Sequence, residues 1–130
     1  MQKNKKIEKL TISLDDSLQD ALKIMDETYA RLLLVMKKDK FRSLLSIGDI
    51  QRAIINNHAL DEPISNILRD EVSYATPKDK PQQIKERMLQ KRTEFMPIVN
   101  NNNKLVKVVF WEDLFKEKKR IEARLNLPVV

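Results

Sequence analysis

The chain has 130 residues and a formal net charge of +6, with 42% hydrophobic and 34% charged residues, no cysteine, one histidine and one glycine. This composition excludes disulfides, thiolate or histidine-rich metal sites and glycine-rich phosphate loops, so we do not expect self-contained catalysis. Lysine and arginine are interleaved with acids and only 5% of residues are aromatic, so nucleic-acid binding is not predicted either.

The sequence predicts a cytoplasmic protein without a membrane span. No apolar run reaches the roughly 18 residues that a transmembrane helix needs. The basic start of the chain lacks the apolar region of a signal peptide, and the absence of cysteine fits the cytoplasm.

The first elements along the chain are an arm and a helix. Residues Lys3–Leu10 are polar and basic, and they are expected to form an arm that becomes ordered only near Leu10. Asp15, Asp16 and Ser17 are candidate helix caps. The residues that follow are apolar at the spacing of one helix face, which predicts an amphipathic helix over Leu18–Met25.

Two strands and a second helix come next. Leu32–Met36 is an apolar run between charged residues, as expected of a buried strand, and Phe41–Leu45 forms a hairpin with it. Ser46 follows directly, and apolar residues then recur at helical spacing up to Ile54. A short strand therefore runs straight into a helix, with Ser46 at the junction.

Ser46 and Asp49 permit two interpretations. A serine at a helix start caps free backbone N–H groups, and those same groups bind phosphate. Asp49 lies one turn into the helix and provides acceptors suited to a pair of ribose hydroxyls. The alternative is a capping box that binds no ligand.

The pattern then begins again. Asp61–Asp70 contains Pro63 and a short amphipathic turn, and it separates the two halves. Ser13–Asp16 aligns with Thr76–Asp79 at an offset of 63 residues, and one extra residue in a later turn aligns Asp49 with Asp113. Each half is predicted to have an apolar sheet face that the other half covers.

These two β-α-β-β-α units, with Ser46-x-x-Asp49 in the first copy and Met96-Pro97-Ile98-Val99 in the second, resemble a tandem CBS-domain (Bateman) module. The resemblance extends from Leu10 to about Lys116. It implies an α/β (α+β) fold of two CBS units packed as a pseudo-symmetric pair. The expected parts are a first unit with its N-terminal arm (1–69), a second unit (70–116) and a helical linker (117–130).

The resemblance also implies a function: the binding of an adenosine nucleotide such as AMP, ADP or ATP in clefts between the units. In the first copy Ser46 would contact phosphate and Asp49 the ribose hydroxyls. Arg31 stands where several members of the family place a basic phosphate contact, although a surface arginine at a strand edge is an equal alternative. Gly48 would admit close approach at the helix start.

The second copy departs from this pattern. Phe110 replaces the hydroxyl residue, and Glu94 puts a negative charge at the position that matches Arg31. Asp113 is retained, but an aspartate early in a helix is favoured by the helix dipole without any ligand. We therefore expect a degenerate second site that is closed or holds something uncharged.

The expected partners lie outside this chain. The charged segment Leu114–Leu125 is predicted to be a connecting helix, and the ending Asn126–Val130 is similar to the entry into sugar-phosphate nucleotidyltransferases. The module is thus expected to regulate such a catalytic domain in a longer chain. It is expected to form a homodimer through the exposed helices at Leu18–Met25 and Ile50–Ile54 and the equivalent helices of the second copy. The alternative function is a structural dimerisation module without a ligand.

Overall fold

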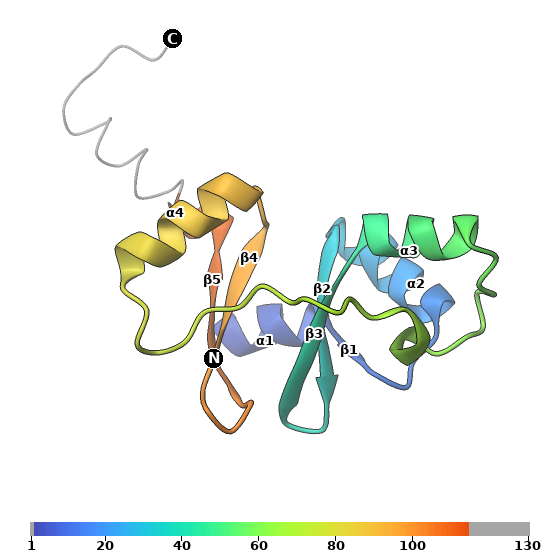
Figure 1. Cartoon of the computed structure of the whole chain (residues 1–130), viewed down its shortest axis with the longest axis horizontal. Coiled ribbons are helices and arrows are strands. Elements are labelled where there is room, and N and C mark those ends of the chain that lie inside the picture. The colour runs from blue at the N-terminus through green and yellow to red at the C-terminus, as the bar shows by residue number, and fades with distance from the viewer. Residues whose placement is uncertain (1, 115–130) are drawn as a thin grey trace, which may run out of the picture.

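Two units of similar construction lie next to each other in the computed structural model, which describes residues 2–114 (Figure 1). The first unit contains a sheet in the order β1-β2-β3, with β1 parallel and β3 antiparallel to β2. Its elements are α1 (Gln2–Lys9), β1 (Thr11–Ser13), α2 (Leu18–Thr28), β2 (Leu32–Lys37), β3 (Lys40–Ser46), α3 (Ile47–Ile55) and the 3-10 helix η1 (Ile64–Ile67).

The second unit repeats this order with a shorter sheet. Its elements are α4 (Pro81–Lys91), β4 (Phe95–Val99) and β5 (Leu105–Phe110), and residues 111–114 are again helical. β4 and β5 pair antiparallel. A single parallel bridge from Ala75 to Ile98 stands where Ile12 pairs with Val35 in the first unit. The described residues therefore have the mixed helix and strand content, in two units, that the repeat predicts.

The repeat also recurs in backbone detail. The helices α2 and α4 have the same length, and both end in a residue with left-handed backbone, Tyr29 (φ 60°) and Arg92 (φ 50°). The backbone N–H of Ile47 donates to the carbonyl of Arg31 at 2.9 Å, and that of Trp111 donates to the carbonyl of Glu94 at 2.8 Å. The start of each last helix is thus attached to the residue before the first hairpin strand of its own unit.

The N-terminal segment is a helix, and the prediction of an arm ordered only near Leu10 was wrong. α1 packs against the junction of the two units, where Ile7 and Leu10 contact buried residues of both sheets. The ammonium group of Lys6 lies 3.9 Å from the ring centroid of Phe110 and also pairs with Glu112. These contacts come from the other end of the chain, so the local sequence did not indicate them.

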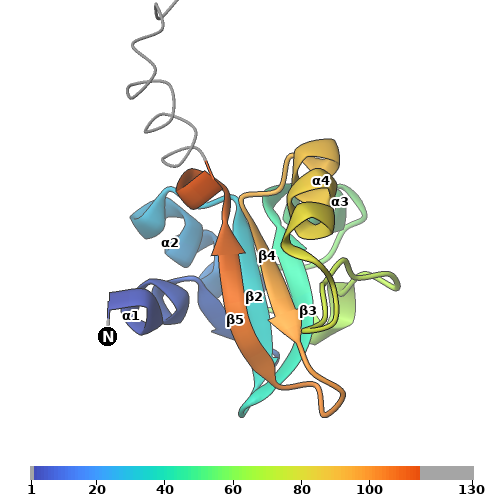
Figure 2. The same ribbon diagram turned by 90° about the vertical axis from the view of Figure 1, so that its left-hand side faces the viewer.

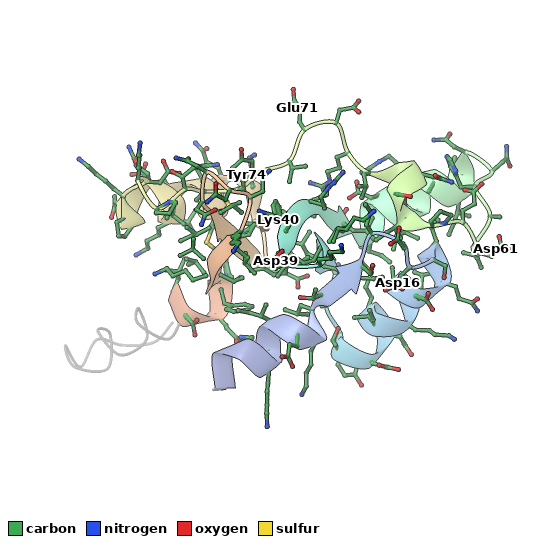
Figure 3. The ribbon with its side chains drawn as sticks, turned by 90° about the horizontal axis from the view of Figure 1, so that it is seen from below. Asp16, Asp39, Lys40, Asp61, Glu71 and Tyr74 are labelled. Carbon is green, nitrogen blue, oxygen red and sulfur yellow. The ribbon has the colours of Figure 1, made fainter. Side chains whose placement is uncertain are left out.

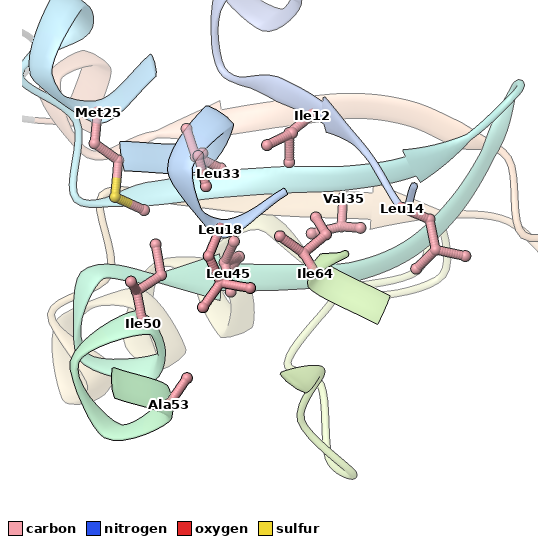
Figure 4. Packing of buried hydrophobic residues seen from close by; sticks show 11 residues of the cluster. Ile12, Leu14, Leu18, Met25, Leu33, Val35, Leu45, Ile50, Ala53 and Ile64 are labelled. Carbon is pink, nitrogen blue, oxygen red and sulfur yellow. The ribbon is translucent and has the colours of Figure 1, made fainter. Parts of the chain in front are cut away.

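Side chains on opposite faces of β2 belong to different hydrophobic cores, because successive residues of a strand point to opposite faces of a sheet. Leu33 and Val35 face α2 and α3 within the first unit (Figure 4). Leu32 and Leu34 instead pack with Phe95 of the second unit. The two sheets lie face to face, with β4 and β5 in front of β2 and β3 in Figure 2. Each unit thus covers an apolar sheet face of the other, as predicted.

The hairpin ends also join the two units. The backbone N–H of Phe41 donates to the carbonyl of Asn103 at 2.7 Å, and the Lys40 ammonium donates to the carbonyl of Asn102 at 2.7 Å. The ring of Phe41 lies 6.0 Å from that of Tyr74, on the segment that connects the units. Figure 3 shows Asp39, Lys40 and Tyr74 gathered at this junction. The units are therefore held together at their hairpins as well as through the sheet faces.

The apolar face of the helix at Leu18–Met25 is buried in the core of the first unit, where Leu18 and Ala21 are fully covered, and dimerisation through the exposed parts of the helices stays a prediction. Exposed apolar side chains lie on α3 and α4, at Ile54, Ile55 and Leu89. The linker 117–130 and most of the helix expected at 114–125 lie outside the described residues. Among residues 2–114, no helix has the length and apolar content to cross a membrane.

Candidate functional site

The first turn of α3 has a fully formed cap. The hydroxyl of Ser46 accepts the backbone N–H of Asp49 at 3.1 Å, and the Asp49 carboxylate accepts the backbone N–H of Ser46 at 2.8 Å. Ser46 has extended backbone (φ −99°, ψ 162°), so β3 passes into α3 without a loop. The motif therefore forms a capping box, and ligand binding by Ser46 and Asp49 stays a prediction.

The carboxylate of Asp49 also binds two arginines. Its side chain is 7% exposed; one oxygen accepts Arg52 Nη2 at 2.6 Å and the other accepts Arg69 Nε at 2.8 Å. Burial raises the pKa of Asp49, but the Ser46 backbone N–H and the Arg69 guanidinium outweigh it, so the pKa lies below its ordinary value. Asp49 is accordingly a charged group held in place by three donors.

A cavity of about 330 Å³ opens beside Ser46, between the two units, and is called the first cleft here. Its walls come from three places: the start of β2 with the β3–α3 junction, the segment connecting the units, and the end of α4 with the start of β4. The polar residues lining it are Arg31, Ser46, Arg69, Ser73, Lys91, Arg92, Thr93 and Glu94.

The first cleft is strongly cationic. Four of its side chains carry a positive charge and one, Glu94, a negative charge. Lys91 donates to the hydroxyl of Ser73 at 3.0 Å, and Arg69 pairs with Asp49. Within residues 2–114, the guanidinium groups of Arg31 and Arg92 have no carboxylate at ion-pair distance. An anion in the cleft would find a helix N-terminus together with cations that lack a protein counter-ion.

The predicted residues of the first site are divided between this cleft and its surroundings. Ser46 and Arg31 line the first cleft together. Asp49 lines a neighbouring cavity of about 320 Å³, the adjacent cavity, with Arg52 on one side and Arg69 on the other. Gly48 lines neither cavity. A Cβ at Gly48 would meet Arg52 at 3.5 Å, an ordinary van der Waals contact, so the backbone there does not require glycine.

A second cavity, called the second cleft, opens at Phe110 and Glu94, so this site is not closed, and the alternative of an uncharged occupant stays a prediction. It has a volume of about 840 Å³ and is lined by the end of α2, α1, and the β5 end with the helix that follows. Phe110 takes the place of Ser46 and is 6% exposed, while Glu94 takes the place of Arg31. Asp113 is exposed and is not among the lining residues. The lining combines aromatic side chains with acids and bases, so the second cleft lacks the cationic excess of the first.

Three cations of the first cleft were not identified from the sequence. Arg69 comes from the connecting segment, and Lys91 and Arg92 come from the end of α4 in the other unit. The only signal for them was a basic pair at the end of a predicted helix. That pair becomes a ligand-facing wall only when the second unit packs on the first. Residues 2–114 contain no cluster of histidine, cysteine or carboxylate residues able to hold a metal ion.

Comparison with known proteins places this architecture in a family. The CBS domain family model matches residues 5–56 and 64–120. Among curated proteins, an inosine-5'-monophosphate dehydrogenase from Methanocaldococcus jannaschii is 27% identical over 116 residues, which are 88% of this chain and 22% of that enzyme. The chain thus spans about a fifth of the length of that relative.

Solved structures share the fold. CbpB in complex with c-di-AMP matches with a TM-score of 0.74 at 11% identity, over 89% of this chain and 80% of that one. A CBS domain protein from Pyrobaculum aerophilum complexed with AMP matches with a TM-score of 0.64 at 19% identity, over 81% and 82% of the two chains. Because the family model matches both repeats, the chain belongs to the CBS-domain family and contains a tandem pair of CBS units, a regulatory module rather than a catalytic one.

Proposed function

We propose that this CBS pair senses an adenine nucleotide, which binds in the first cleft with its phosphate at Ser46 and Arg31. The observation that carries the proposal is the set of four cationic side chains around the N-terminus of α3, against one carboxylate. A helix N-terminus and guanidinium groups are the donors that phosphate prefers in proteins. The cleft volume of about 330 Å³ lies at the lower end of the range for small-molecule sites.

The identity of the base is supported by the comparisons. The two structural relatives described above are complexes with AMP and with c-di-AMP, both of which contain adenine. In our proposal the ribose faces Asp49, AMP, ADP and ATP are the candidate ligands, and the second cleft binds no anionic nucleotide.

The experiment that tests this function is a thermal-unfolding series with AMP, ADP, ATP and GMP. A ligand that binds only the folded state stabilises it by about 2.7 kcal/mol at about 100 times its dissociation constant. We expect adenine nucleotides to raise the melting temperature, and the Arg92→Ala variant to bind AMP about tenfold more weakly, which corresponds to about 1.4 kcal/mol. Lys85→Ala is the matched control, since Lys85 is an exposed cation of α4 that lines neither cleft. No stabilisation by any nucleotide would contradict the proposal.

For the regulated enzyme we propose a broader class than the end of the sequence predicts. A catalytic domain of nucleotide metabolism is supported by the similarity to an inosine-5'-monophosphate dehydrogenase. The sugar-phosphate nucleotidyltransferase remains a proposal that rests on residues 126–130 alone. In both cases binding in the first cleft would change how the two units pack, and that change would bias the attached domain.

A structural dimerisation module is the second candidate function. Ile55 is 75% exposed on α3 and Leu89 is 52% exposed on α4, and Figure 1 shows α4 to the left and α3 to the right of the strands, both on the upper side of the molecule. Homodimerisation through this side would cover both residues. Analytical ultracentrifugation of the wild type and of Ile55→Glu tests it, and a wild-type monomer at all concentrations would exclude it.

A further inference from the structure

The ribose-facing group of the first site is blocked in the free protein. A carboxylate has about four acceptor positions, and three donors occupy three of those of Asp49, which leaves one open: the Ser46 N–H, Arg52 Nη2 and Arg69 Nε. A ribose that uses two hydroxyls needs two of these positions. One donor therefore has to leave before Asp49 can bind the sugar.

The geometry identifies which donor leaves. The Ser46 N–H belongs to the helix cap, and losing its acceptor would expose the start of α3. Arg52 is 68% exposed and lines the adjacent cavity but not the first cleft. Arg69 lines both cavities, so its guanidinium stands between Asp49 and the space that the nucleotide would occupy. A displacement of Arg69 would thus affect the lining of both cavities.

A phosphate in the first cleft provides Arg69 with a second partner. The other cations of the cleft, Arg31, Lys91 and Arg92, repel the Arg69 guanidinium while the cleft holds no anion. When a phosphate is present, the same guanidinium can form a charge-assisted pair with it. Arg69 thus has a charged acceptor both before and after ligand binding, and Asp49 exchanges one charged donor for two hydroxyls.

We propose that Arg69 is an exchange latch: nucleotide binding transfers its guanidinium from the carboxylate of Asp49 to the ligand phosphate, and Asp49 then accepts the ribose hydroxyls. This proposal rests on the proposed function and adds its regulation. Arg69 lies on the segment that connects the two units, whereas Asp49 lies on α3 of the first unit. The exchange therefore releases the connecting segment from α3 and makes the attachment of the units depend on the ligand.

The exchange predicts opposite effects of Arg69 on adenosine and on AMP. Adenosine must displace Arg69 without offering it a phosphate, so Arg69→Ala is expected to bind adenosine about five- to tenfold more tightly than the wild type. AMP loses a phosphate contact in the same variant and gains no affinity overall. The preference for AMP over adenosine, measured by isothermal titration calorimetry, is expected to fall at least fivefold.

Arg52→Ala is the matched control, because Arg52 binds the other oxygen of Asp49 but does not line the first cleft. It is expected to change the affinities for adenosine and AMP by the same factor and leave the preference unchanged. Arg69→Gln keeps a hydrogen-bond donor for Asp49 and carries no charge. It is expected to lose the preference in the same way, so the test does not depend on one variant folding.

The outcomes separate the exchange from the function on which it rests. An unchanged AMP preference in Arg69→Ala and Arg69→Gln, with normal AMP binding by the wild type, overturns the exchange alone. Weaker adenosine binding by both variants also overturns it, because Arg69 would then support the ribose site rather than block it. A wild type that binds neither adenosine nor AMP overturns the proposed function and the exchange together.

Discussion

Arg31 and Glu94 occupy equivalent positions in the two repeats, and the backbone N–H of Arg31 donates a hydrogen bond to Oε1 of Glu94 at 2.8 Å. The two residues line the wall of the first cleft, and Glu94 also lines the second. The same sequence position thus contributes a cation in one unit and an anion in the other. This difference gives the pseudo-symmetric clefts unlike charge.

Replacing Glu94 by glutamine should strengthen binding of anionic nucleotides. The amide oxygen can still accept from the Arg31 N–H, while the negative charge leaves the cleft wall. We expect AMP to bind two- to fivefold more tightly in Glu94→Gln, or about 0.4–1 kcal/mol for a partly exposed charge, by calorimetry at fixed ionic strength. Glu27→Gln, which alters the second cleft alone, should have no effect. Weaker AMP binding by Glu94→Gln would show that phosphate does not approach this wall.

Two capping serines allow stability to be separated from binding. Ser17 and Ser46 each accept the N–H of an aspartate three residues later at 3.1 Å, in reciprocal capping boxes. Alanine at either position should reduce the free energy of unfolding by about 1 kcal/mol, as measured with urea. Only Ser46→Ala should also weaken nucleotide binding, since Ser17 lies outside the first cleft. Equal nucleotide affinity in the two variants would remove Ser46 from the site.

Phe110 should matter for stability rather than for binding. It is 6% exposed, its ring lies 6.0 Å from that of Phe95, and Lys6 of α1 covers it. Phe110→Ala should cost about 3–5 kcal/mol of unfolding free energy. Val106→Ala, at a 52% exposed position of the same strand, should cost less than about 0.5 kcal/mol. Hydrogen exchange should be faster in α1 of Phe110→Ala, and unchanged exchange there would show that α1 does not depend on this ring.

Acid should remove the contribution of Asp49 to stability. The pKa of Asp49 in the folded protein lies below its ordinary value of 3.8. Because the pKa of Asp49 is lower in the folded than in the unfolded protein, its carboxylate stabilises the fold at any pH above the pKa of the unfolded state. This stabilisation is lost as the pH falls through the pKa of the folded state. The unfolding free energy of the wild type should therefore exceed that of Asp49→Asn at pH 7, and the difference should shrink below about pH 3.8. A difference that stays constant down to pH 2.5 would contradict this linkage.

The sequence by itself determined the repeat and the local parts of the first site. Helical spacing indicated the buried faces of the first two helices and apolar runs indicated the buried strands, because the helical period is a property of the backbone. The family resemblance placed Arg31 with Ser46, and the hairpin register, which pairs Leu32 with Ser46, explains why Arg31 lies beside the start of α3. The capping role of Asp49 also followed from its distance of three residues from Ser46.

Tertiary structure alone decided the remaining contacts. Arg69 reaches Asp49 from 20 residues away, and Lys91 and Arg92 enter the first cleft from the other unit. The helix α1 forms where Phe110 and Glu112 meet Lys6 from the far end of the chain. Such contacts depend on how the two sheets stack, and no short-range spacing in the sequence encodes that stacking. The positive charge of the first cleft therefore depends on how the two units pack, whereas the fold of each unit follows from the spacing of apolar residues in its own sequence.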